Sequence, residues 1–102
     1  MSEFKDVTIV KAVNSYFEGQ VTSRTIKFSD GSEKTLGFML PGKYEFSTTA
    51  PEMMEIISGK LFVSLPGEKT REINGDQSFD VPGNAKFTIS IIEATDYCCS
   101  YL

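Results

Sequence analysis

The side chains best suited to chemistry gather in one short segment of the chain. Its candidate groups are two aromatic rings, three neighbouring hydroxyl groups and, at the end, a carboxylate, in the order Tyr44, Phe46, Ser47, Thr48, Thr49 and Glu52. The hydroxyls and the backbone N–H groups of the turn before Glu52 can donate hydrogen bonds to an anion. The carboxylate can stabilise positive charge or, where burial raises its pKa, act as an acid. The rings can stack on a flat ligand, whether it has one ring or two fused rings.

Histidine is absent from all 102 residues. It is the commonest metal ligand in proteins and the side chain whose ordinary pKa lies near neutrality. Ser-His-Asp and Cys-His catalysis, histidine-rich metal sites and the HExxH class of zinc enzymes are therefore excluded within one chain. Any catalysis must use carboxylate, hydroxyl, amine, guanidinium, phenol or thiol groups.

Length and charge limit the kind of protein and of partner. A chain of 102 residues with 40% hydrophobic and 24% charged residues is ordinary for a globular protein, and we expect a single domain over residues 1–102. The formal charge of −4 opposes binding to phosphate backbones and to anionic lipid. Neither nucleic acid nor a membrane is therefore an expected partner.

Cysteine use and the first residues indicate the compartment. Cys98 and Cys99 are adjacent, would point to opposite faces of a strand, and make no disulfide framework. The N-terminal residues show no basic region followed by a long apolar run, and no later apolar stretch is long enough to span a membrane. We expect a cytoplasmic protein with neither a signal peptide nor a transmembrane span.

Pairs of turn-forming residues divide the chain into short segments. These pairs are Asp30-Gly31, Pro41-Gly42, Ala50-Pro51, Ser58-Gly59, Pro66-Gly67, Asn74-Gly75 and Pro82-Gly83. The segments between them are rich in Val, Ile, Phe, Thr and Tyr and often alternate, which predicts strands. The expected strands cover residues 19–28, 34–40, 43–48, 53–58, 60–65, 70–73, 77–81, 85–92 and 97–101. Short strands at this spacing predict an all-β sandwich or barrel.

Alternation of apolar and polar residues assigns the faces of these strands. The inward face carries Tyr44, Phe46 and Thr48, then Leu61, Val63 and Leu65, then Phe87, Ile89 and Ile91, and finally Tyr97, Cys99 and Tyr101. The alternate set, which includes Lys43, Lys60, Phe62 and Lys86, should face solvent or a partner chain.

The first eighteen residues contain neither Gly nor Pro. This stretch is compatible with a strand, a short helix or an arm that pairs with another subunit. We assign residues 1–13 to an N-terminal arm or extra strand.

Two stretches resemble the paired motifs of a cupin barrel. The first runs from Pro41 to Gly59, with Glu52 seven positions before the glycine. The second runs from Gly75 through a short apolar strand to the Pro82-Gly83 turn. The resemblance implies a single-domain cupin-like β-barrel or jelly roll.

The metal-binding positions of cupins are changed in this chain. Cupin metal sites use two histidines and a glutamate from the first motif and one histidine from the second. The corresponding positions here are Phe46, Thr48, Glu52 and either Lys86 or Phe87, so only the glutamate remains. One carboxylate is not a metal site, and we expect no metal ion.

A closer resemblance covers residues 14–102. The segments that carry it are Asn14-Ser-Tyr-Phe-Glu-Gly19, Tyr44-Glu-Phe-Ser-Thr48, Pro51-Glu52 with Met54, Ile57-Ser-Gly59, Val81-Pro-Gly83, Phe87 and Tyr97-Cys-Cys-Ser-Tyr-Leu102. In this order they resemble the small bacterial pyrimidine/purine nucleoside phosphorylase family. The resemblance implies metal-independent phosphorolysis of purine and pyrimidine nucleosides to free base and ribose 1-phosphate. It implies nucleosides and inorganic phosphate as ligands, no cofactor, and a cytoplasmic homodimer.

Phosphorolysis needs donors for phosphate, stabilisation of a ribose that resembles an oxocarbenium ion, and help for the departing base. With the resemblance, the candidate catalytic residues are Glu52, Thr48 and Tyr44. The candidate substrate-binding residues are Phe46, Ser47, Thr49, Phe79, Phe87 and Tyr97. Lys43 or Lys86 can add positive charge.

The chain departs from the family pattern at two positions. Asn84 stands where the family has histidine, and Ser100 stands where the family tail carries arginine. Alternation places Ser100 outside the barrel. These departures and the missing metal ligands support an alternative, a non-catalytic cupin module that binds a small ligand such as a nucleoside or sugar.

Overall fold

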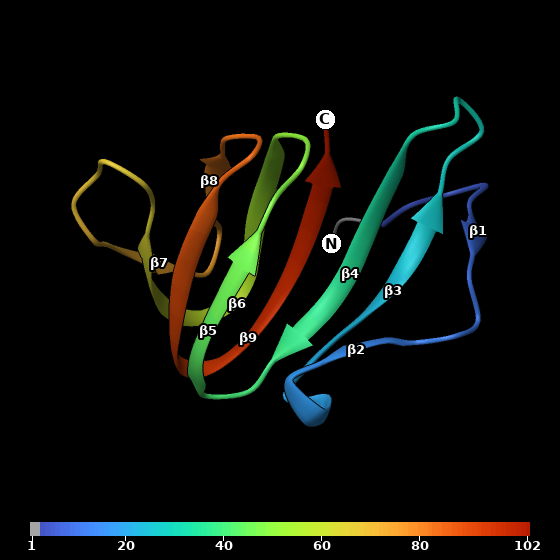
Figure 1. Ribbon diagram of the computed structural model, residues 1–102. Coiled ribbons are helices and arrows are strands. Elements are labelled where there is room, and N and C mark those ends of the chain that lie inside the picture. Colours follow the sequence, from blue (N-terminus) through green and yellow to red (C-terminus); the bar gives the residue numbers. More distant parts are fainter. Residues whose placement is uncertain (1–2) are drawn as a thin grey trace.

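The computed structural model describes residues 3–102, whose strands form one antiparallel sheet that folds over on itself (Figure 1). Its elements are β1 (Thr8–Ile9), β2 (Asn14–Tyr16), the 3-10 turn η1 (Phe17–Gly19), β3 (Val21–Lys27), β4 (Glu33–Met39), β5 (Gly42–Ser47), β6 (Glu52–Ser64), β7 (Arg71–Asn74), β8 (Gln77–Val81) and β9 (Lys86–Tyr101). The all-β prediction is confirmed, because the short η1 is the one helical element in this part of the chain. No helix within residues 3–102 is long and apolar enough to cross a membrane.

Two long strands connect all the others. β6 has 13 residues and β9 has 16, and they pair from Glu52 opposite Tyr101 to Ser64 opposite Thr88. β4 and β5 pair with opposite halves of β9, while β7 and β8 pair with opposite halves of β6. The bent pair therefore belongs to both layers of a jelly roll, one completed by β3, β4 and β8 and the other by β5 and β7.

The predicted division into strands is wrong at two places. Residues 52–64 form one strand, because Ser58-Gly59 is an irregularity in β6 and not a turn between two strands. The register of β6 on β9 shifts on both sides of Gly59, whose φ is +112°. Residues 86–101 likewise form one strand where two segments were predicted. A bulge bends a strand without ending it, so the pattern of turn residues alone misplaces the boundary.

The N-terminal stretch forms one edge of the sheet. β1 and β2 both pair with β3, and η1 connects β2 to it. The Asn14 side-chain amide donates hydrogen bonds to Ser23 Oγ at 3.2 Å and Thr25 Oγ1 at 3.1 Å. Of the predicted arm at residues 1–13, residues 1–2 lie outside the described residues.

The core lies between the two layers and follows the predicted inward face. From that face Tyr44, Leu61, Val63, Leu65, Phe87, Ile89, Ile91, Tyr97 and Cys99 are buried. Val21, Met39, Met54, Ile56, Ile73, Phe79 and Val81 complete the cluster. Side chains that differ from expectation include Tyr101, which is 45% exposed, and Phe62 on the outer face, which is half-buried.

We predict that Gly59→Ala destabilises the protein more than Gly31→Ala. Both glycines have positive φ, +112° and +89°, which other residues rarely adopt. An added Cβ at Gly31 meets nothing within 4 Å, whereas at Gly59 it lies 2.5 Å from Thr95 Oγ1 and 2.7 Å from the Ala94 carbonyl oxygen. This overlap should cost about 1–3 kcal/mol beyond the conformational penalty that both variants share. Urea denaturation measures the difference, and equal free energies of unfolding would contradict the close packing at the bulge.

Candidate functional site

A cavity of about 270 Å³ lies between the layers, where β6 begins and β9 ends. Its polar lining consists of Tyr16, Ser23, Thr35, Ser47, Glu52, Tyr97, Cys99 and Tyr101. Its apolar lining consists of Val21, Met39, Phe46, Met54, Phe87 and Ile89. Among the described residues, Glu52 contributes the one carboxylate, and neither Lys nor Arg lines the cavity. The site thus combines a single acidic group with hydroxyl donors and aromatic walls.

Glu52 occupies the first position of β6, opposite Tyr101 of β9 and Val81 of β8. Its side chain is half-buried, and burial raises the pKa of the carboxyl group above its ordinary value. The Cys99 thiol donates a hydrogen bond to Glu52 Oε1 over 3.4 Å, which opposes that rise in pKa. The protonated form of Glu52 therefore persists to higher pH than in an exposed glutamate.

Two phenol groups on β9 line the cavity beside Glu52. Tyr97 lies directly against Gly37 of β4, where a Cβ would come within 2.6 Å of the phenol oxygen, so only glycine leaves room for the ring. Burial, aided by the nearby Cys99, raises the pKa of Tyr97 to about 12. Burial also raises the pKa of Tyr101, whose hydroxyl shares a hydrogen bond with Thr35 Oγ1 at 3.2 Å. Both phenols are protonated at neutral pH and can donate hydrogen bonds.

Aromatic rings form one wall of the cavity. Phe46 of β5 stacks on Phe87 of β9 with 5.8 Å between ring centroids. The Phe17 ring of η1 packs edge-on against Phe46, with 5.5 Å between ring centroids, and lies tilted against Tyr44 at 5.0 Å. Phe17 and Glu18 both have positive φ, +52° and +55°, an unusual backbone for bulky residues. The turn therefore holds Phe17 against the outer side of the stacking wall.

The structure brings some of the predicted site residues together. Those that line the cavity are Glu52, Phe46, Ser47, Phe87 and Tyr97. They come from three strands: β5 and β6, which follow one another in the sequence, and the distant β9, which pairs with both.

Other predicted site residues lie outside the cavity lining. Tyr44 donates a hydrogen bond to the Leu40 carbonyl at 2.7 Å. Thr48 donates to the Pro82 carbonyl at 2.6 Å and accepts from the Ala85 N–H at 3.1 Å, which ties β5 to the turn before β9. In addition, Phe79 is buried in the core, while Thr49, Lys43 and Lys86 are exposed.

Several cavity residues were not predicted as site residues. Cys99 and Tyr101 were predicted to face inward, but their position beside Glu52 depends on the register of β9 on β6. Ser23 and Thr35 are buried hydroxyls of β3 and β4. Each shares its strand face with other polar residues, Thr25 and Lys27 on β3 and Glu33 on β4, so alternation in the sequence did not indicate them.

The two departures from the family pattern lie outside the cavity lining as well. Asn84 lies in the turn before β9, with φ of +51°, a conformation that Asn adopts more readily than most residues. Ser100 lies next to Cys99 on the other face of β9, as predicted from alternation, but it is 6% exposed. Its hydroxyl has no hydrogen-bond partner in the described structure.

The positions that hold a metal in cupins do not fit a metal here. Phe46 and Phe87 offer no ligand atom, and the Thr48 hydroxyl is engaged with Pro82 and Ala85. Lys86, the alternative to Phe87 at the last position, is exposed and does not line the cavity. Of the residues at these positions, only Glu52 has a side-chain group that commonly binds metal ions in cupins. No group of three or more His, Cys, Asp or Glu side chains that could hold a metal ion occurs in the described part of the chain.

Comparison with known proteins identifies the family. The family model named Pyrimidine/purine nucleoside phosphorylase matches residues 11–101. Proteins of that name from Chlorobium chlorochromatii and Sulfurovum sp. are 55% and 56% identical to this chain over all of its length, and the matches cover 99% and 100% of those proteins.

Solved structures agree with the fold. A protein of unknown function from Acinetobacter sp. ADP1 is 42% identical over 98% of both chains, with a TM-score of 0.93. A cupin superfamily protein from Desulfitobacterium hafniense is 16% identical, with a TM-score of 0.69 over 87% of this chain and 83% of that one, which supports the cupin-like fold. From the family model and the full-length relatives, the chain belongs to the pyrimidine/purine nucleoside phosphorylase family.

Proposed function

We propose that this protein cleaves purine and pyrimidine nucleosides by phosphorolysis, giving free base and ribose 1-phosphate. The observation that carries the proposal is the half-buried Glu52 carboxyl group in a cavity with aromatic walls and hydroxyl donors. Membership of the family and the names of its full-length relatives support the same reaction. The proposed enzyme is a pentosyltransferase of broad base specificity.

In this reaction a phosphate oxygen forms a bond to C1′ of the ribose while the bond from C1′ to the base nitrogen breaks. The electron pair of that bond leaves with the base, which takes up a proton. A protonated Glu52 can supply this proton, and an ionised Glu52 can stabilise positive charge on the sugar. Because burial raises the pKa of Glu52, the acid role is the one that we propose.

The other cavity groups suit the parts of the substrates. Tyr97, Tyr101 and Thr35 can donate hydrogen bonds to phosphate or to ribose hydroxyls. Phe46 and Phe87 offer faces for stacking, and stacking accepts purines and pyrimidines alike because every base has a π-face. Because no Lys or Arg of the described chain lines the cavity, we propose that neutral donors bind the phosphate.

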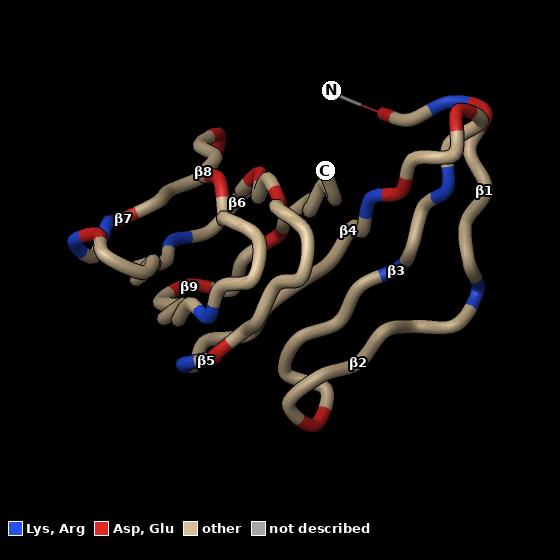
Figure 2. Tube along the Cα trace, turned by 45° about the horizontal axis from the view of Figure 1, so that its top comes forward, with Lys and Arg blue, Asp and Glu red and all other residues tan. Residues whose placement is uncertain are grey.

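Small ligands fit the charge of the molecule better than polyanions do. Figure 2 shows Lys and Arg spread along the chain and interspersed with Asp and Glu, and the formal net charge is −4. Within the described residues, this mixed distribution and the negative net charge disfavour binding to the phosphate backbone of a nucleic acid. We propose nucleosides and phosphate as the ligands and no metal or other cofactor, since Glu52 is the one candidate ligand left at the cupin metal positions.

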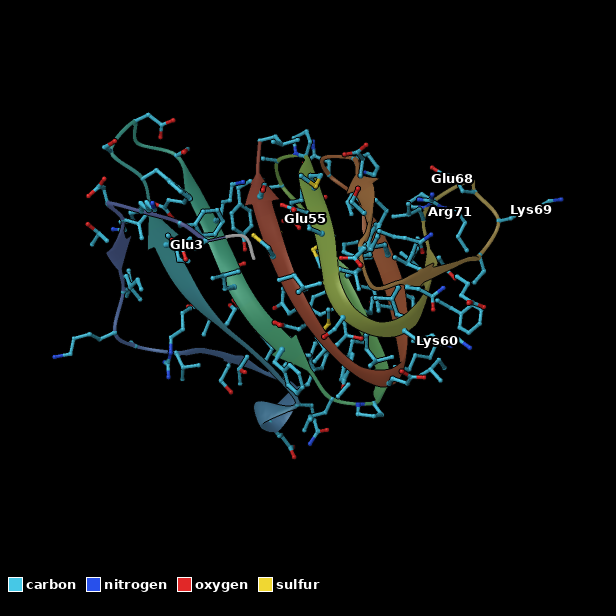
Figure 3. All side chains as sticks on the ribbon, turned by 180° about the vertical axis from the view of Figure 1, so that it is seen from behind. Glu3, Glu55, Lys60, Glu68, Lys69 and Arg71 are labelled. Carbon is cyan, nitrogen blue, oxygen red and sulfur yellow. The ribbon has the colours of Figure 1, made fainter. Side chains whose placement is uncertain are left out.

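Glu52→Gln is predicted to lower the rate of base release by about 10² or more, because the amide cannot transfer the proton. The assay follows free base and ribose 1-phosphate from uridine and from adenosine, in EDTA, with and without phosphate. Glu55→Gln is the matched control, since Glu55 lies on the same strand beside β9 (Figure 3) but at the alternate position, opposite Cys98 and Ser78.

Phosphate-dependent release of both bases, lost in Glu52→Gln and kept in Glu55→Gln, is the expected result. Intact nucleosides with folded protein would contradict the proposal and favour the binding module. An unchanged rate in Glu52→Gln would remove this residue from the chemistry.

A second prediction separates structural from catalytic roles at Tyr44. Its hydroxyl is engaged with the Leu40 carbonyl and does not line the cavity. Tyr44→Phe should therefore lower the free energy of unfolding by about 1 kcal/mol and leave kcat nearly unchanged. Thermal unfolding and steady-state rates measure the two effects, and a tenfold loss of kcat at full stability would show that the Tyr44 hydroxyl takes part in the reaction.

We also propose a cytoplasmic homodimer. The two cysteines are free thiols, as is usual in a reducing compartment. On the outer surface, Val13 and Phe38 are exposed beside Leu36 in a shallow groove. Light scattering should give twice the chain mass of 11.3 kDa at micromolar concentration, and a monomer would contradict this part of the proposal.

A further inference from the structure

Cys99 is the residue in hydrogen-bond contact with the Glu52 carboxyl group. We propose that Cys99 is the positioning residue for Glu52: its thiol orients the carboxyl group in the cavity and sets the pH range in which Glu52 acts. This inference rests on the proposed function for its kinetic consequence, but the contact itself can be tested without any activity.

The strand register creates the contact. Glu52 lies opposite Tyr101, and Met54 lies opposite Cys99, so Cys99 is the diagonal neighbour of Glu52 on the same face. Cys99 is 4% exposed, and its Sγ lies 3.4 Å from Glu52 Oε1. Both residues line the cavity, so one carboxyl oxygen faces the thiol at the boundary of the space that would hold the substrate.

The thiol acts as a donor over the whole useful pH range. Burial, and after it the neighbouring Glu52, raises the pKa of Cys99 to about 12, so the thiol keeps its proton at neutral pH. A hydrogen bond donated to a carboxylate favours the ionised form. Cys99 therefore opposes the effect of burial on Glu52 and keeps this residue able to lose and regain a proton.

The other titratable groups around Glu52 do not replace this contact. Tyr97 and Tyr101 of β9 and Tyr16 of β2 line the same cavity, and the Tyr101 hydroxyl is shared with Thr35 of β4. On β8 the residue opposite Glu52 is the apolar Val81. The neighbouring Asp80 of β8 is exposed and lies opposite Met53, at the alternate position.

The adjacent cysteine provides a matched control. Cys98 is also a free and buried thiol, but it lies opposite Leu36 and Glu55 and does not line the cavity. Loss of a buried sulfur from the same strand therefore occurs in both Cys98→Ala and Cys99→Ala. Only Cys99→Ala removes the donor to Glu52.

The test compares pH profiles of kcat/KM for phosphorolysis of uridine by wild type, Cys99→Ala, Cys99→Ser and Cys98→Ala. Without the donor the pKa of Glu52 rises, so the limb of the profile set by Glu52 moves to higher pH. This direction holds for either role of Glu52. If Glu52 acts as an acid, kcat/KM falls as the pH rises through its pKa, and if it acts as a carboxylate, kcat/KM rises there. In both cases the limb moves with the pKa of Glu52. The serine variant keeps a donor and should stay at or below the wild-type position, while Cys98→Ala should match wild type.

A titration of the Glu52 side-chain carboxyl carbon by NMR, assigned with Glu52→Gln, tests the same shift without turnover. An upward shift in Cys99→Ala alone supports the proposal, even if every nucleoside stays intact and the proposed function fails. Coincident titrations of wild type and Cys99→Ala would overturn it. So would a serine variant that titrates with the alanine variant, because the donor would then have no effect.

Discussion

The pairing of β6 with β9 is the constraint on which the rest of the structure depends. Two strands of 13 and 16 residues run through both layers, and every other strand except the β1 to β3 group pairs directly with one of them. Their register places Glu52 opposite Tyr101 and Met54 opposite Cys99 at one end, and Val63 opposite Ile89 at the other. A shift of one residue would turn the inward set of either strand to the outer face. A single register of β6 on β9 therefore positions both the core residues and the cavity residues.

The cavity shows what a cupin-like barrel offers when the metal ligands are absent. A metal site would place a Lewis acid at its centre. In its place this chain has one half-buried carboxyl group, whose pKa burial raises, surrounded by hydroxyl, phenol and thiol donors. Burial raises the pKa values of Tyr97 and Cys99 to about 12, so these two groups keep their protons at neutral pH. The residues at the former ligand positions serve packing and turn formation instead: Phe46 stacks on Phe87, and Thr48 ties β5 to the turn before β9. The chemistry that we propose relies on these neutral donors and on the acidity of Glu52.

The sequence predicted the fold class, most strand positions and the inward face, because alternation and turn residues are local properties of the chain. It also named Glu52 as a candidate site residue, and Glu52 lines the cavity. It did not predict that Gly59 bends β6 without ending it, because a glycine in a bulge and a glycine in a turn look alike in one dimension. The contact between Glu52 and Cys99 joins residues 47 positions apart and follows from register, which no local pattern contains. Tyr44 and Thr48 have the right chemical groups near Glu52 in sequence, but their hydroxyls are directed to backbone carbonyls.

We propose that the glycosidic bond is broken in the cavity around Glu52. A crystal structure with ribose 1-phosphate and a free base bound tests it most directly. We expect the ribose within hydrogen-bonding reach of the Glu52 carboxyl group, with the base against the wall of Phe46 and Phe87. Ligands bound outside this cavity, or bound within it with Glu52 turned away from both sugar and base, would contradict it.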